Sequence, residues 1–467
     1  MVSLATTVAG LARPGLWVYA SGRLVSGLLG LVWLWAVVRL LGAQQAGVYF
    51  GAMALFELLQ LVSSAGVYGY VQRFVPAAWA TPASAAPALG LGTLLAWRAV
   101  TLCLAAAGLA WAWPVLTAWL GWPAGAVQTG LLLGLLMAGG LARLLEVLLE
   151  SLQQQGTAQW LNAVRNVARL AGLFFLGVLW NRADFGGVNT VLALELTVTV
   201  VYAAGTTLWL ARLAPTRPAQ VGRTALRRPA DRQRWRFTAE GFAAVVVSQC
   251  AGLDMVKLLV SAVFGPAALG AFGLAAALAD IVARYLPANF VHGPMRRWLA
   301  LHGDKGGQRK QALAPVRRLL RGHVVVLSLL IVAVAALGPA VQRTALPVSG
   351  FEPLVMFLLG LLAAQYLQAL RLGLGLLAHA ETDNRSVLLA NLAATPAPLV
   401  VLALFPVLGP FSAVVGVAVF ELALVAVLSW RLALPLTELS GPPRWWAGML
   451  AATALAVAVA VAVAMQL

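Results

Sequence analysis

Charged residues are scarce in this chain. Only 10% of its 467 residues are Asp, Glu, Lys or Arg, whereas a soluble domain carries about 25%. Hydrophobic residues make up 61%, and the mean hydropathy is +0.88. So few polar side chains could not cover an apolar core of this extent in water, which excludes an ordinary soluble domain. A lipid bilayer needs no such cover.

Cysteine, histidine and the common catalytic motifs are also lacking. Cys103 and Cys250 lie inside apolar runs, with the spacing of neither a disulfide framework nor a zinc site. The four histidines do not cluster, and the chain has no G-x-x-x-x-G-K-[ST] phosphate loop, no H-E-x-x-H and no Asp-x-Asp. We therefore expect no catalytic residues, no metal, no cofactor and no nucleic-acid partner, and we do not expect an enzyme.

What the chain has in abundance is continuous apolar sequence. Its runs of Leu, Ala, Val and Gly are about 20 residues long, enough to cross the roughly 30 Å hydrocarbon core as helix. Strands of a membrane barrel would instead alternate apolar and polar residues. The sequence predicts an all-α polytopic membrane protein with thirteen spans, at roughly 15–40, 46–76, 86–112, 126–150, 157–180, 187–211, 238–264, 267–292, 320–340, 352–378, 385–408, 410–433 and 445–466.

Positive charge is concentrated in two short segments. Residues 212–236 and 296–321 each hold eight Lys or Arg and one acid, which is half of the 32 basic residues in the chain. Both segments follow an even-numbered span and therefore lie on the same side of the membrane. The positive-inside rule makes that side cytoplasmic, and the N-terminus is then cytoplasmic as well. The start of the chain lacks a clear cleavable signal peptide.

The sequence contains an internal repeat. Aligning the chain with itself so that Gly42 matches Gly265 also matches four further pairs of similar residues. These pairs are Gly47 with Gly270, Tyr49 with Phe272, Glu57 with Asp280, and Arg73 with Arg296. We call this the repeat alignment. Because six spans separate the copies, the two halves have the same orientation, which predicts two six-helix bundles related by a pseudo-twofold axis along the membrane normal. We place the bundles at 1–211 and 238–433, a basic cytoplasmic linker at 212–237 and an additional transmembrane helix at 434–467.

One local pattern carries a family resemblance. The first span ends in Arg39-Leu40-Leu41-Gly42, a Gly and an aromatic follow at Gly47 and Tyr49, and the second span closes with Gly66, Gly69, Arg73 and Phe74. This pattern resembles the start of oligosaccharide flippases, the O-antigen and polysaccharide-transport members of the multidrug/oligosaccharidyl-lipid/polysaccharide exporter superfamily. The multidrug/toxic-compound extruders and the lipid II flippase belong to the same superfamily. The thirteenth span departs from the commonest plan of twelve.

The resemblance implies a transporter that works without ATP hydrolysis. It would move polyprenyl-diphosphate-linked oligosaccharide from the inner to the outer leaflet of the bacterial cytoplasmic (inner) membrane by alternating access, for surface polysaccharide export. Its partners would be the lipid-linked substrate, membrane lipids and the polysaccharide polymerase machinery. Two alternatives stay open: a multidrug/toxin extruder of the same superfamily, and a membrane enzyme of polysaccharide assembly. Such enzymes usually need acidic loop residues or a large outer loop, and neither is evident.

Six charged residues lie away from the ends of spans 1, 2, 7 and 8, the spans that line the central cavity in the resembling family. A charge at the bilayer centre costs at least about 2.5–3.5 kcal/mol, so each should face protein or water. Because a diphosphate needs compensating cations, we expect three of them to bind substrate: Arg23, Lys257 and Arg284. We expect the other three, Glu57, Asp254 and Asp280, to adjust the positions of the cations or to carry a coupling proton. The spacing of Glu57, Gln60 and Ser64 predicts one polar stripe on the second span.

A structural interpretation of some charges competes with this one. Asp254 with Lys257 (i, i+3) and Asp280 with Arg284 (i, i+4) have the spacing of neutralising pairs. For spans 4 and 5 we favour a network internal to the bundle, formed by Arg143, Glu146, Glu150, Arg165 and Arg169. Arg98 and Glu195 receive no role from the sequence.

Overall fold

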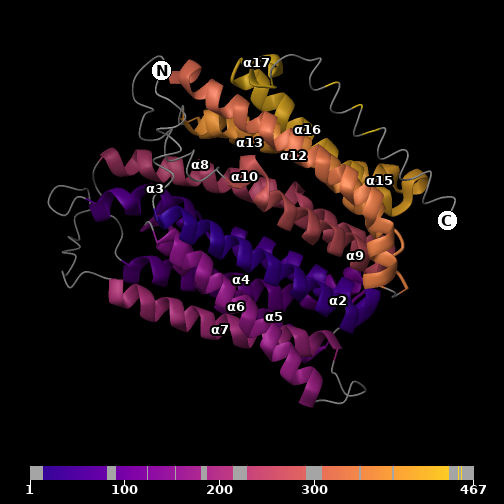
Figure 1. Ribbon diagram of the computed structural model, residues 1–467. Helices are drawn as coiled ribbons and strands as arrows, with labels where there is room; N and C mark the ends of the chain where they lie inside the picture. Colours follow the sequence, from indigo (N-terminus) through magenta and orange to yellow (C-terminus); the bar gives the residue numbers. More distant parts are fainter. Residues whose placement is uncertain are drawn as a thin grey trace. The chain divides into compact units, whose positions relative to one another are not determined.

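The computed structural model describes residues 14–80, 91–123, 125–152, 154–179, 187–213, 229–290, 308–346, 349–380 and 383–440, with the single positions 447, 451 and 454. Within these ranges every regular element is a helix (Figure 1). The prediction of an all-α fold is confirmed.

The helices follow the predicted spans closely. The first half contains α2 (Pro14–Val62), α3 (Val67–Ala80), α4 (Leu91–Leu120), α5 (Ala126–Ser151), α6 (Gln155–Leu179) and α7 (Gly187–Leu213). The second half contains α8 (Pro229–Ala251), α9 (Leu253–Tyr285), α10 (Pro287–Phe290), α12 (Gln308–Ala345), α13 (Leu354–Ala380), α14 (Asn384–Ala394), α15 (Ala397–Leu408), the 3-10 helix η3 (Gly409–Phe411), α16 (Ser412–Arg431) and α17 (Leu436–Ser440). The predicted thirteenth span lies almost entirely outside the described residues.

Eight stretches of the described chain are long and apolar enough to cross a membrane. Three of them are 46 to 48 residues long: Trp17–Val62, Thr238–Tyr285 and Asn384–Arg431. A helix of that length measures about 70 Å, more than twice the thickness of the hydrocarbon core, so each has room for two of the predicted spans. The 25-residue helix α6 is not among the eight, because polar residues at 162, 165, 166 and 169 lower its hydropathy.

Two glycines interrupt the long helices in the same way. Gly42 breaks α2 with φ 67° and ψ 175°, and Gly265 breaks α9 with φ 83° and ψ 170°. Positive φ with extended ψ is a backbone region open essentially only to glycine. These are counterparts in the repeat alignment, so both copies of the repeat have the same break at the same place.

The chain divides into two compact units. Unit 1 contains Met1–Leu41 and Leu59–Phe242, and unit 2 contains Gly42–Leu58 and Ala243–Leu467. The division differs from the predicted bundles at 1–211 and 238–433 in two respects: Gly42–Leu58 belongs to unit 2, and unit 1 continues to Phe242. The linker at 212–237 lies mainly outside the described residues. The separation into two six-helix bundles therefore stays a prediction.

One helix is central to each unit. In unit 1, α5 packs against α3, α4, α6 and α7, and in unit 2, α13 packs against α9, α12, α14 and α16. A buried cluster that includes Tyr68, Leu94, Leu144 and Leu210 joins α3, α4, α5 and α7. The repeat alignment carries α5 onto residues 349–374, which overlap α13. The central helices are therefore counterparts in the repeat.

Candidate functional site: polar side chains within the helix bundles

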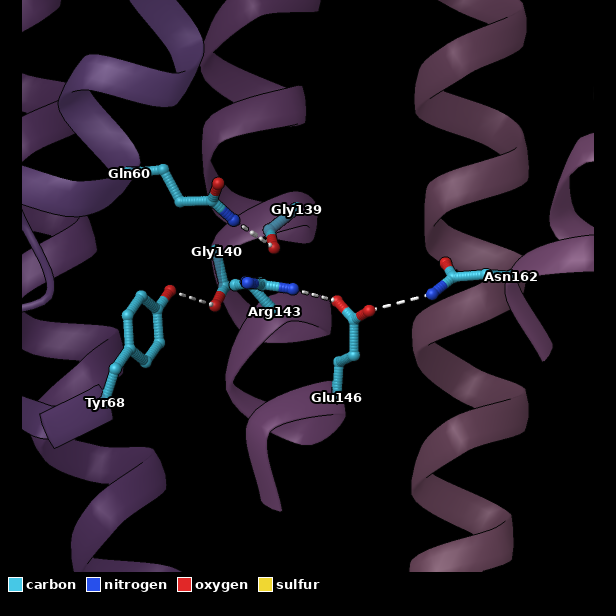
Figure 2. Close-up of polar contacts among 7 residues, drawn as sticks. All are labelled: Gln60, Tyr68, Gly139, Gly140, Arg143, Glu146 and Asn162. Carbon is cyan, nitrogen blue, oxygen red and sulfur yellow. Dashed lines mark hydrogen bonds and ion pairs between the residues drawn. The ribbon is translucent and has the colours of Figure 1, made fainter. Parts of the chain in front are cut away.

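The carboxylate of Glu146 on α5 joins two helices of unit 1. It accepts a hydrogen bond from Arg143 Nη1 at 2.7 Å, one turn earlier on α5, and another from Asn162 Nδ2 of α6 at 2.8 Å (Figure 2). The Glu146 side chain is only 13% exposed, whereas that of Arg143 is 46% exposed. The ion pair lets an acid lie inside the bundle, and the amide of Asn162 ties α6 to it.

Further along α6, the same polar face contacts α2 and α7. Arg169 Nη2 forms an ion pair of 2.6 Å with Glu195 of α7, whose side chain is 3% exposed. Arg165 Nη2 donates to Thr199 Oγ1 of α7 at 3.0 Å, and Asn166 Nδ2 donates to the carbonyl oxygen of Ser26 on α2 at 2.8 Å. These contacts agree with a network internal to the bundle. They also explain how these polar residues of α6 can lie within a membrane-spanning bundle, because each of them has a partner on another helix.

Arg98 on α4 is a fully buried cation that the sequence analysis left without a role. Its guanidinium donates to the carbonyl oxygens of Gln60 and Gly140, at 2.9 and 3.3 Å, and to Ser63 Oγ at 3.0 Å, and it lies 5.1 Å from the ring centre of Tyr68. Gln60 is in the last turn of α2, where helix carbonyls have no partner within the helix. Arg98 therefore caps α2 at its break before α3. A mid-span arginine far from any acid in sequence was the available signal for such a role.

Gly139 and Gly140 of α5 receive the other polar side chains beside this break. Gln60 Nε2 donates to the Gly139 carbonyl at 2.9 Å, and the Tyr68 hydroxyl donates to the Gly140 carbonyl at 3.4 Å (Figure 2). A Cβ atom at Gly140 would come within 2.9 Å of Arg98 Nη2. The small residue leaves space for these donors to reach the backbone of α5.

The predicted site residues of the first half lie in different units. Arg23 belongs to unit 1, is partly buried, and donates from Nη1 to the hydroxyl of Tyr19, whose ring centre is 5.7 Å away. Glu57 belongs to the part of α2 assigned to unit 2 and is exposed. The predicted stripe of Glu57, Gln60 and Ser64 does not share one environment, because Gln60 and Ser64 are 5% and 3% exposed.

The four predicted site residues of α9 form two ion pairs. Lys257 Nζ lies 2.8 Å from Asp254 Oδ1, with both side chains less than one fifth exposed. Arg284 Nη2 lies 2.5 Å from Asp280 Oδ2, with both side chains more than half exposed. The two spacings that favoured neutralising pairs therefore do form pairs within the helix. Their part in binding substrate or in coupling stays a prediction.

Unit 2 contains an ion pair that the sequence analysis missed. Arg371 Nε of α13 lies 2.6 Å from Glu421 Oε2 of α16, whose side chain is 10% exposed. A lone acid within the apolar span 410–433 was the available signal, since a charge in lipid needs a partner. These networks do not resemble a metal site: among the described residues no group of three or more His, Cys, Asp or Glu fits a metal ion.

Solved structures of membrane transporters match the chain over nearly its whole length. Lipid II flippase MurJ in an inward closed conformation has a TM-score of 0.63 and 12% identity, covering 96% of this chain and 98% of that chain. The MATE multidrug transporter DinF-BH has a TM-score of 0.59 and 16% identity, covering 92% and 97%. A MATE transporter of Vibrio cholerae has a TM-score of 0.55 and 14% identity, covering 89% and 98%.

These likenesses concern the fold. No protein-family model matches the chain, and no curated protein matches it in sequence. With 12 to 16% identity, what the matched structures share with the chain is its helical architecture. The chain has the all-helical fold seen in the lipid II flippase and in the MATE transporters of the MOP superfamily.

Proposed function

We propose that the chain is a flippase for polyprenyl-diphosphate-linked oligosaccharide. It would carry this lipid from the inner to the outer leaflet of the bacterial cytoplasmic membrane by alternating access, for surface polysaccharide export, with its N-terminus in the cytoplasm. The observation that supports the proposal most is the near full-length match to a flippase, which has the highest TM-score of the structures compared above. Membrane lipids and the polysaccharide polymerase machinery are its proposed partners.

The chemistry of the substrate assigns roles to the charged residues. A diphosphate is costly to remove from water, so its passage requires cations that replace the lost hydration. Arg23 is our first head-group ligand, because a planar guanidinium binds two phosphate oxygens at once. Lys257 and Arg284 are the second and third, and each would share its charge between substrate and the acid on its own helix turn.

The three acids would act on these cations. Asp254 and Asp280 hold Lys257 and Arg284 within hydrogen-bonding distance, so they set where those cations lie when substrate arrives. Protonation of either acid would release its cation. We therefore propose Asp254, Asp280 and Glu57 as residues that tune the cavity or carry a coupling proton.

A multidrug extruder is the second candidate function. It is favoured by the MATE structures, whose TM-scores of 0.59 and 0.55 approach that of the flippase. The two functions differ in the cargo they predict. An extruder would move a small organic compound such as the fluorescent cation ethidium, and a flippase would move an amphiphile with an anionic head group.

The test uses purified protein in proteoliposomes that contain a lipid-linked oligosaccharide. Arg23→Ala should abolish flipping while expression stays normal, and Arg23→Lys should restore it only in part. Arg39→Ala is the matched control, because Arg39 is an exposed arginine on the same helix, stacked 5.2 Å from the ring centre of Trp35. Normal flipping by Arg23→Ala would remove the head-group role of this residue. Ethidium transport without any oligosaccharide flipping would favour the extruder.

A further inference from the structure

One arginine inside unit 1 has no acid of its own. Arg165 of α6 donates from Nη2 to Thr199 Oγ1 of α7, and its guanidinium lies 5.3 Å from the ring centre of Tyr202 on the same helix α7. Among the described residues Arg165 forms no ion pair, and its Nε is buried without an acceptor. A charge taken out of water is costly unless an opposite charge compensates it.

The two acids nearest to Arg165 each pair with another arginine. Glu146 and Glu195 are the carboxylates that attract Arg165 electrostatically. Glu146 accepts from Arg143 Nη1 at 2.7 Å, and Glu195 lies 2.6 Å from Arg169 Nη2. Each acid is therefore already neutralised, and Arg165 adds one uncompensated positive charge to the interior of the bundle.

Unsatisfied donors lie together at this excess charge. Besides Arg165 Nε, two further buried groups have no hydrogen-bond partner among the described residues: Arg169 Nε and the hydroxyl of Tyr202, a residue that is 8% exposed. Arg165 and Arg169 are one turn apart on α6, so their like charges repel each other. A guanidinium can only donate, so the missing partner is an acceptor. Water would accept these bonds but would not neutralise the charge.

We propose that Arg165, Arg169 and Tyr202 form a binding site for one small inorganic anion, of the class of chloride, between α6 and α7. A single negative charge balances the excess of one and reduces the repulsion between the two guanidinium groups. The site lies among packed helices of unit 1, so it admits a halide and excludes a large organic anion such as gluconate. This inference concerns unit 1 alone and does not depend on the cargo.

The first test measures whether chloride stabilises the folded protein. Purified protein in detergent is unfolded with urea in sodium chloride or in sodium gluconate of equal concentration, and tryptophan fluorescence reports the transition. Chloride at ten times its dissociation constant should lower the unfolding equilibrium constant about elevenfold, and the effect should follow a binding curve. Equal stability in the two salts at every concentration would overturn the proposal.

The second test removes the excess charge. Arg165→Met should abolish the difference between chloride and gluconate, whereas Arg39→Met, which removes an exposed arginine of unit 1, should keep it. A chloride response retained by Arg165→Met would overturn the site. If Arg165→Met does not fold, Tyr202→Phe decides, because it keeps the aromatic ring and loses only the hydroxyl. Its chloride affinity should fall about 2- to 13-fold, the effect of one hydrogen bond, and an unchanged affinity would overturn the site.

The third test supplies the negative charge from the chain itself. Thr199→Asp places a carboxylate where Thr199 Oγ1 now accepts from Arg165 Nη2 at 3.0 Å. This variant should be equally stable in chloride and in gluconate, because Arg165 then has an acid of its own. Thr199→Asn is the matched control, since its side chain has nearly the same size and no charge, and it should still respond to chloride. An equal chloride response in the two variants would overturn the proposal.

Discussion

Replacing Glu195 by alanine should destabilise unit 1 strongly. The change removes the carboxylate that lies 2.6 Å from Arg169 Nη2 and leaves that guanidinium only 17% exposed among the helices of the bundle. Loss of one partner from a buried ion pair costs about 3–5 kcal/mol, because the remaining charge is uncompensated. We expect a loss of this size in the free energy of unfolding.

The assay is denaturant-induced unfolding of the purified protein in detergent, followed by tryptophan fluorescence. Glu240→Ala is the matched control in the same unit, since Glu240 pairs at 2.8 Å with Arg236, whose side chain is 73% exposed. Water screens such a pair, so its loss should change stability little. The double variant Arg169→Ala/Glu195→Ala should be more stable than Glu195→Ala, because it also removes the guanidinium that Glu195→Ala leaves without its carboxylate. The reasoning is wrong if Glu195→Ala is no less stable than Glu240→Ala.

Three further outcomes are expected. Arg98→Met should lower the free energy of unfolding by at least about 1.5–3 kcal/mol, because a hydrogen bond from a charged group contributes about that much and Arg98 donates three; an unchanged denaturation midpoint would contradict the capping role. Although burial raises the pKa of Asp383, hydrogen bonds from the hydroxyl and backbone N–H of Ser386 bring it below its ordinary value. The stability it adds is therefore present above that ordinary pKa and is lost as the pH falls through the lowered one, and Asp383→Asn should flatten the acid limb of a melting-temperature curve. Ala225→Cys, as the single cysteine, should resist an impermeant thiol reagent in intact cells, and labelling there would invert the predicted topology.

The helices were predictable because lipid leaves the chain few choices. A run of about 20 apolar residues must form a helix in a bilayer, so the described helices follow the first twelve predicted spans. The correspondence of the two helix breaks was predictable for a different reason. The repeat alignment pairs Gly42 with Gly265, and both have the same glycine-only conformation.

The assignment of residues 42–58 to a unit was not predictable from the same pattern. Span order places these residues with the first bundle. Their packing in unit 2 depends on Gly47 and Gly270, whose lack of a side chain lets the backbones of α2 and α9 touch, and hydropathy does not predict such a contact. The predicted polar stripe assumed one environment for three residues at helical spacing. Glu57 is exposed and belongs to unit 2, whereas Gln60 and Ser64 are buried and belong to unit 1, and helical spacing alone does not show where the units divide.

The buried acids show what the bilayer imposes on a charged residue. Glu195 on α7 and Glu421 on α16 occupy helices that the repeat alignment superimposes, and in that alignment they lie within about one helical turn of each other. Each pairs with an arginine of another helix in its own unit, Arg169 or Arg371. Glu195 was noticed in the sequence without a role and Glu421 was not noticed, because their partners are distant in sequence. An ion pair between two helices can be identified only once the fold is known, whereas the helical spacing alone predicts the two ion pairs within α9. Spacings of i, i+3 or i, i+4 therefore predict the ion pairs within one helix, whereas the ion pairs that hold the helices of a unit together depend on the fold.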